Sequence, residues 1–134
     1  MTNMESFLNA WTPRMQGLLR IILGFIYLPH GTSKLWGVPH APAANNVELF
    51  SLFGLGGVLE TICGVLLLIG LFTRSAAFVA SGTMAVAYFM FHSPSAFLPI
   101  VNKGELSVVL SFVFLYFVFA GAGDWSVDAA RRKG

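Results

Sequence analysis

The chain has 134 residues, of which 56% are hydrophobic and only 10% are charged. Soluble domains carry about 25% charged residues, so this composition excludes a water-covered globule and predicts a membrane protein. The net charge of +2 is too scattered to indicate nucleic-acid binding, and the single cysteine, Cys63, excludes an intrachain disulfide.

Four apolar segments follow one another along the chain, separated by proline-, asparagine- or arginine-containing links. They run from about residue 15 to 36, 49 to 72, 76 to 92 and 105 to 122. A helix of ~20 residues spans the ~30 Å hydrocarbon core of a bilayer. Pro13 is suited to the start of the first helix. The sequence therefore predicts an all-α, transmembrane four-helix bundle forming one domain over residues 1–134.

The distribution of basic residues predicts the orientation of these helices. Arg14, Arg74 and the run Arg131–Lys133 fall on one side of the membrane, whereas Lys34 and Lys103 fall on the other. Lysine and arginine are enriched in cytoplasmic segments. We therefore expect an up-down-up-down order with both termini in the cytoplasm.

The first helix carries nearly all of its polar and small residues on one face. The positions alternate by three and four residues, which keeps them on one helical stripe. They are Gly17, Arg20, Gly24, Tyr27, Gly31 and Lys34, with His30 beside them. Ionisable groups inside a bilayer are costly, which makes this stripe a candidate polar core.

The second helix repeats the pattern with Gly57, Glu60 and Gly64. Glycines let membrane helices approach closely, so the two glycine faces are expected to pack together. Glu60 would then meet the first stripe, within reach of Arg20 or His30. Such a buried pair could serve a function or only fix the helix register, and the sequence leaves both readings open.

Further polar residues fall toward the outer side of the last two helices, where they could ring the mouth of a cavity. The candidates are Tyr88, His92, Lys103 and Glu105, together with His30 and Lys34. No phosphate-binding loop, dinucleotide fingerprint or HExxH motif is present, and the histidine spacing does not predict a metal site. The sequence thus predicts a polar core without a motif for autonomous catalysis.

Four motifs, in order, resemble those of the DoxX family. They are Leu19–Gly37 (LRIILGFIYLPHGTSKLWG), Gly56–Arg74 (GGVLETICGVLLLIGLFTR), Asn102–Leu106 (NKGEL) and Gly121–Asp128 (GAGDWSVD). The resemblance implies a multi-pass protein of the bacterial inner membrane, linked to redox or oxidative-stress functions, with some members similar to a quinone-reacting oxidoreductase subunit. The positions that carry over are Arg20, His30, Gly31, Lys34, Glu60, Arg74 and Glu105.

Three functions remain open at this point. The first is a polar intramembrane pocket for a quinone- or lipid-like ligand, with quinone as the candidate cofactor. The second is a non-catalytic assembly subunit that binds redox partner subunits or a second copy of the chain. The third is a small proton-coupled transporter in which Glu60 is the membrane-embedded carboxylate.

Overall fold

The computed structural model describes residues 2–40 and 48–133. Within these residues it contains helices and turns but no strand, so the predicted all-α class is confirmed. The elements in chain order are α1 (Asn3–Trp36), α2 (Leu52–Ile69), α3 (Thr73–Ala87), the π-helical turn η1 (Tyr88–His92), α4 (Pro99–Asn102), α5 (Glu105–Ala120) and α6 (Val127–Lys133).

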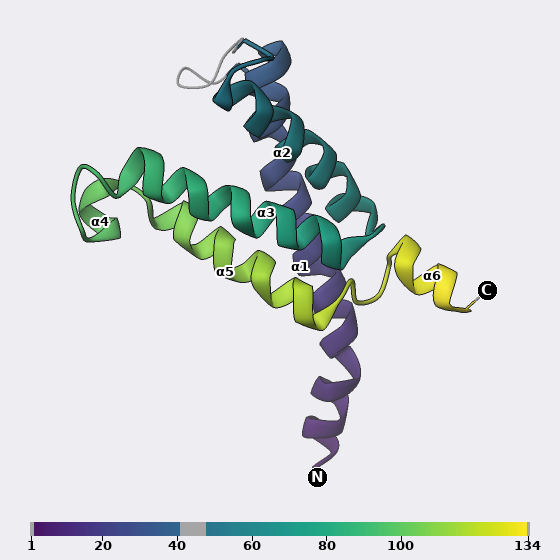
Figure 1. Cartoon of the computed structure of the whole chain (residues 1–134). Helices are drawn as coiled ribbons and strands as arrows, with labels where there is room; N and C mark the ends of the chain where they lie inside the picture. Colours follow the sequence, from purple (N-terminus) through teal and green to yellow (C-terminus); the bar gives the residue numbers. More distant parts are fainter. Residues whose placement is uncertain (1, 41–47, 134) are drawn as a thin grey trace.

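The long helices are arranged as two pairs. α1 packs chiefly along α2, α3 packs along α5, and α2 also contacts α3. In Figure 1 the α3–α5 pair points away from the α1–α2 pair, and the two pairs meet where α2 ends and α3 begins. The N-terminal turns of α1 project beyond the other helices (Figure 1).

Helix α1 begins at Asn3, twelve residues before the expected start near Met15. The cause is a capping box, in which the Thr2 hydroxyl accepts a hydrogen bond from the Glu5 N–H (3.1 Å) and the Glu5 carboxylate accepts one from the Thr2 N–H (2.7 Å). Pro13 therefore lies inside the helix and not at its first turn. The 34 residues of α1 span about 51 Å at the standard rise, well beyond a ~30 Å hydrocarbon core.

Glycines set the register of α1 against α2. A Cβ added at Gly24 would lie 2.7 Å from the Leu68 backbone nitrogen, and one added at Gly64 would lie 2.7 Å from the Leu28 Cα. Gly31 lies in the same way against the backbone of Gly57. The two helix backbones thus touch at positions where any side chain would push them apart.

Large apolar side chains cover much of the surface. Phe78, Phe112 and Phe119 are 66%, 68% and 75% exposed, although they belong to the same helices as the fully buried Phe114 and Ala77. Contiguous apolar surface of this kind is rare in soluble monomers. Two described helices, Leu52–Ile69 and Thr73–His92 (α3 with η1), are both long and apolar enough to cross a membrane. Helix α5 is apolar but shorter.

Helix α3 is capped by a residue that lies 55 positions away. No side chain near its N-terminus caps it, and its cap residue, Phe72, has φ of 49°. Instead, the Asp128 carboxylate accepts hydrogen bonds from the N–H groups of Phe72 (3.0 Å) and Thr73 (2.9 Å). Burial acts to raise the pKa of Asp128, but hydrogen bonding with Thr73 and Phe72 and the charge of Arg131 outweigh it and hold the pKa below its ordinary value.

Replacing Gly64 with alanine tests the close contact between α1 and α2. We expect Gly64→Ala to lower the unfolding free energy by about 1–3 kcal/mol, because the new methyl group overlaps Leu28. Gly82→Ala is the matched control, because a Cβ at Gly82 meets no atom within 4 Å. Thermal unfolding in mild detergent can be followed with a thiol-reactive fluorophore, since Cys63 is buried in the folded protein. Equal stability of the two variants would contradict the proposed contact.

The Asp128 cap predicts a pH dependence. We expect Asp128→Asn to lower the unfolding free energy by about 1–2 kcal/mol at pH 7, because two charge-assisted hydrogen bonds are weakened. The folded-state pKa lies below the unfolded value of ~3.9, so the stabilisation is complete above that value and disappears as the pH falls through the folded-state pKa. The difference between the melting curves of the two proteins should therefore stay constant from pH 7 down to about pH 4 and begin to shrink below that value. A difference that persists unchanged at pH 3 would contradict this account.

Candidate functional site

At the end where the two helix pairs meet, Arg20 joins three segments of the chain. Its side chain is fully buried. All five N–H donors of the guanidinium reach backbone carbonyls: Nε reaches Ala122 (3.0 Å), Nη1 reaches Leu67 (2.7 Å) and Leu68 (3.0 Å), and Nη2 reaches Asp124 (3.2 Å) and Trp125 (2.7 Å). We call this arrangement the Arg20 clamp. It ties α1 to the last turn of α2 and to the segment after α5.

Two further side chains satisfy carbonyls at the end of α5. The Arg74 Nη1 donates hydrogen bonds to the carbonyls of Val118 (2.8 Å) and Phe119 (2.7 Å). The Gln16 Nε2 donates to the carbonyls of Ala120 (3.0 Å) and Gly121 (2.7 Å). The last four carbonyls of any helix lack partners within it, and lipid offers no water to replace them. These donors therefore complete the end of an apolar helix.

The expected pairing of Arg20 with Glu60 does not occur. The antiparallel register places the Arg20 guanidinium beside Gly70, where an added Cβ would lie 2.8 Å from Arg20 Cζ. Glu60 is ten residues earlier in the chain, which corresponds to about 15 Å along a helix. Arg20 therefore has a structural role at the C-terminal end of α2, whereas Glu60 lies half-way along that helix.

Glu60 instead forms an ion pair with Lys34. The Lys34 Nζ donates a hydrogen bond to Glu60 Oε1 at 2.8 Å, and the exposed fractions of the two side chains are 15% and 3%. The second carboxylate oxygen, Oε2, is buried and has no hydrogen-bond partner among the described residues. A buried charged acceptor without a partner is costly, so this oxygen marks a place where a ligand or water donor would be favoured.

The ion pair lies in the wall of a large cavity between the two helix pairs. The cavity has a volume of about 790 Å³. Its lining comes from the C-terminal part of α1, the first half of α2, the second half of α3 with η1, and the start of α5. Most of the lining is apolar, as at Phe53, Leu59 and Leu110. We call it the Lys34–Glu60 cavity.

Four of the residues selected from the sequence line this cavity together: His30, Lys34, Glu60 and His92. Lys103, which was expected near its mouth, lines it as well. His92 is held by a contact of its Nδ1 with the Asn102 carbonyl oxygen at 3.2 Å. The cavity therefore combines cationic and titratable groups with a single carboxylate.

Three other selected residues lie outside the cavity lining. Tyr27 is fully buried and packs edge-to-face against Phe114, with ring centroids 4.9 Å apart. Tyr88 holds the loop before α5, because its hydroxyl donates to the Phe97 carbonyl (3.3 Å) and accepts from Asn102 Nδ2 (3.1 Å). Glu105 is exposed in the first turn of α5, where a negative charge favours the helix dipole.

Sequence reasoning missed Asn102, Gln16 and Asp128 as organising residues. Asn102 is 6% exposed, and its side chain bonds to the Ala96 carbonyl (3.0 Å) and the Gly104 N–H (2.8 Å). The sequence offered one indication of such residues: backbone N–H and C=O groups need hydrogen-bond partners where short apolar helices end. That requirement indicates that donors and acceptors must exist, but it does not identify them.

An all-helical chain with an apolar surface and a cavity containing an ion pair defines a small helical membrane protein. More particularly, the chain belongs to the DoxX family, whose family model matches residues 16–93. It is similar to an uncharacterized protein of Haemophilus influenzae, with 39% identity over 90% of this chain and 93% of that protein. It is also similar to the uncharacterized membrane protein Rv3486 of Mycobacterium tuberculosis, with 27% identity over 94% of this chain and 86% of that protein. No solved structure matches the chain significantly.

The Arg20 clamp predicts that lysine cannot replace Arg20. Lysine has three donors at one point, so at least two of the five carbonyls would lose their partner. We expect Arg20→Lys to lower the unfolding free energy by at least about 2 kcal/mol. Arg14→Lys is the control, because Arg14 is exposed and lies over the Trp11 ring, 4.7 Å from its centroid. Thermal unfolding of both variants in detergent makes the comparison, and equal stability would rule out the clamp.

Proposed function

We propose that the chain is a four-span inner-membrane protein that binds a quinone- or lipid-like amphiphile in the Lys34–Glu60 cavity and thereby supports membrane redox or oxidative-stress functions. Membership of the DoxX family supports the membrane location. The proposed spans are α1, α2, α3 with η1, and α5, with both termini cytoplasmic. The observation that carries the ligand proposal is the unpartnered Glu60 Oε2 in the wall of a large apolar cavity.

The size and lining of the cavity suit a ring with an apolar tail. Small-molecule sites typically have volumes of about 300–1,000 Å³ and apolar walls with a few polar groups. The cavity, at about 790 Å³, lies within this range. Exposed aromatic side chains at its edge, Phe53 and Phe91, add surface on which a planar ring can stack.

The polar groups of the cavity favour a ligand that both donates and accepts hydrogen bonds. The Lys34 ammonium uses one donor on Glu60 and has others that can reach a ligand carbonyl. Glu60 Oε2 is an acceptor that a ligand hydroxyl would satisfy. A quinone and its quinol present a carbonyl and a hydroxyl, respectively, at the same ring position. We therefore expect the reduced form to interact more favourably with Glu60.

The N-terminal turns of α1 favour the partner-binding function as a second candidate. This segment projects beyond the other helices (Figure 1). Its large apolar side chains recur at helical spacing on one face and are all exposed: Met4, Phe7, Leu8, Trp11 and Met15. A redox partner subunit or a second copy of the chain would bury this stripe.

Ligand titration of a Glu60 variant tests the proposal. We expect Glu60→Gln to weaken the binding of a short-chain quinol by about tenfold, because an amide is a poorer acceptor than a carboxylate. Glu105→Gln should leave binding unchanged, because Glu105 is exposed and outside the lining. The measurement is calorimetric titration of detergent-solubilised protein with the quinone and the quinol.

A second variant covers the case in which loss of the ion pair impairs folding. Leu106→Trp adds bulk to the cavity lining without removing Lys34 or Glu60 and should also weaken binding. Equal affinities for wild type, Glu60→Gln and Leu106→Trp would place the ligand elsewhere. Absence of saturable binding to the wild type would overturn the ligand proposal and favour partner binding.

A further inference from the structure

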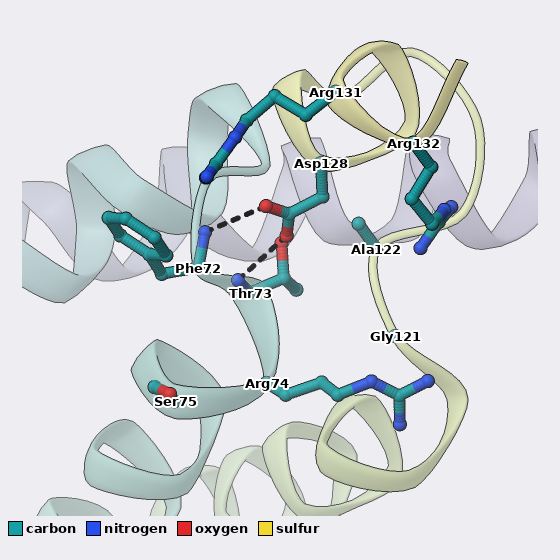
Figure 2. Close-up of a pocket in the computed structure, with 9 residues that line it drawn as sticks. All are labelled: Phe72, Thr73, Arg74, Ser75, Gly121, Ala122, Asp128, Arg131 and Arg132. Carbon is teal, nitrogen blue, oxygen red and sulfur yellow. Dashed lines mark hydrogen bonds between the residues drawn. The ribbon is translucent and has the colours of Figure 1, made fainter. Parts of the chain in front are cut away.

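A second cavity lies at the opposite end of the molecule, beside the Arg20 clamp. It has a volume of about 420 Å³ and is bounded by the start of α3, the segment after α5, and α6. Three arginines line it: Arg74, Arg131 and Arg132. Figure 2 shows Arg74 and Arg132 approaching the segment Gly121–Ala122 from opposite sides, while Arg131 reaches toward Phe72. We call this cavity the arginine cleft.

The cleft carries a net positive charge. Asp128 is the only acidic residue in its lining, so three arginines and one aspartate give 3 − 1 = +2. The Asp128 carboxylate already accepts two backbone hydrogen bonds at the start of α3 (Figure 2). It is therefore occupied by its capping role, which leaves the guanidinium groups as the dominant charges facing a ligand.

Two of the three arginines are held in place by the protein. The Arg74 Nη1 donates to the carbonyls of Val118 and Phe119, and the Arg131 guanidinium lies over the Phe72 ring, 5.2 Å from its centroid. Arg132 is exposed and forms no hydrogen bond or ion pair with another described residue. A ligand would therefore meet preorganised guanidinium groups and one further donor free to close on it, which lowers the entropic cost of binding.

These features fit a phosphate group. Planar guanidinium groups bind phosphate oxygens in bidentate geometry, and arginine is the preferred residue for such contacts. We propose that the arginine cleft binds a phosphate group, carried either by an anionic phospholipid or by a soluble phosphate compound. This proposal does not depend on the ligand of the Lys34–Glu60 cavity.

The surroundings of the cleft favour the lipid as the source. The cleft lies where the apolar helix α3 begins and the apolar helix α5 ends. Phe72 and Phe119 border this boundary and are 56% and 75% exposed. A phospholipid with its headgroup in the cleft would place its acyl chains against such apolar surface. Basic residues beside a membrane span commonly attract anionic lipid headgroups.

Lipid titration separates the two sources. Detergent-solubilised protein is titrated with phosphatidylglycerol, with phosphatidylcholine of the same acyl chains, and with inorganic phosphate at constant ionic strength. We expect saturable binding of phosphatidylglycerol, weaker binding of phosphatidylcholine, and binding of inorganic phosphate only if the phosphate group suffices without a lipid. Absence of preference for phosphatidylglycerol together with absence of phosphate binding would overturn the proposal.

Substitutions locate the site. The double variant Arg131→Gln/Arg132→Gln should weaken phosphatidylglycerol binding by about 5-fold per arginine, or about 25-fold in total. The control, Arg14→Gln, removes one positive charge from an exposed position outside both cavities and is compared with the single variant Arg132→Gln. The single variant Arg132→Gln shows whether weaker binding occurs without a folding defect. Among the described residues, Arg132 forms no contact that supports the fold. An equal loss of affinity in the control would overturn the assignment to the cleft.

Discussion

The hydrogen bonds of Arg20 are the contacts on which the arrangement of the helices depends. One buried guanidinium satisfies carbonyls from the end of α2 and from the segment after α5, while its own backbone belongs to α1. A buried cation is expensive in an apolar environment unless every donor is used, and here all five are. The same groups would cost several kcal/mol if left unpaired in lipid. A buried charge and helix-end carbonyls without partners are each unfavourable alone. In the clamp, each satisfies the other through hydrogen bonds.

The clamp also determines where the molecule can be open. With α1, the last turn of α2 and the segment after α5 held together by Arg20, the two helix pairs diverge toward the other end (Figure 1). The Lys34–Glu60 cavity occupies this divergence. The glycines of α1 and α2 keep their pair closely packed up to the ion pair itself, since Gly57 would contact Lys34 Cβ at 3.2 Å if it carried a side chain. The Arg20 clamp at one end thus fixes the positions of the helices that form the cavity walls. The cavity lies where these helices diverge.

The sequence predicts the helical class well because the hydropathy of each segment is a local property of the chain. It predicts the pairing of side chains poorly because that pairing depends on the register of one helix against another. Glu60 was expected to meet Arg20 or His30, but the glycine contacts bring Lys34 to it. The early start of α1 could have been found, since Thr2 and Glu5 have the spacing of a capping box. The cap that Asp128 supplies to α3 could not, because no local pattern connects residues 55 positions apart.

The position of the capping groups in the chain has a consequence for biogenesis. Arg20 requires carbonyls of Ala122, Asp124 and Trp125, and α3 requires the carboxylate of Asp128. All of these acceptors follow α5 in the chain. A ribosome synthesises a chain from its N-terminus and covers the most recent residues, so these acceptors emerge after α1, α2, α3 and α5. The helices are therefore made before the contacts that tie them together can form, and their final arrangement is reached only after the segment that follows α5 has emerged.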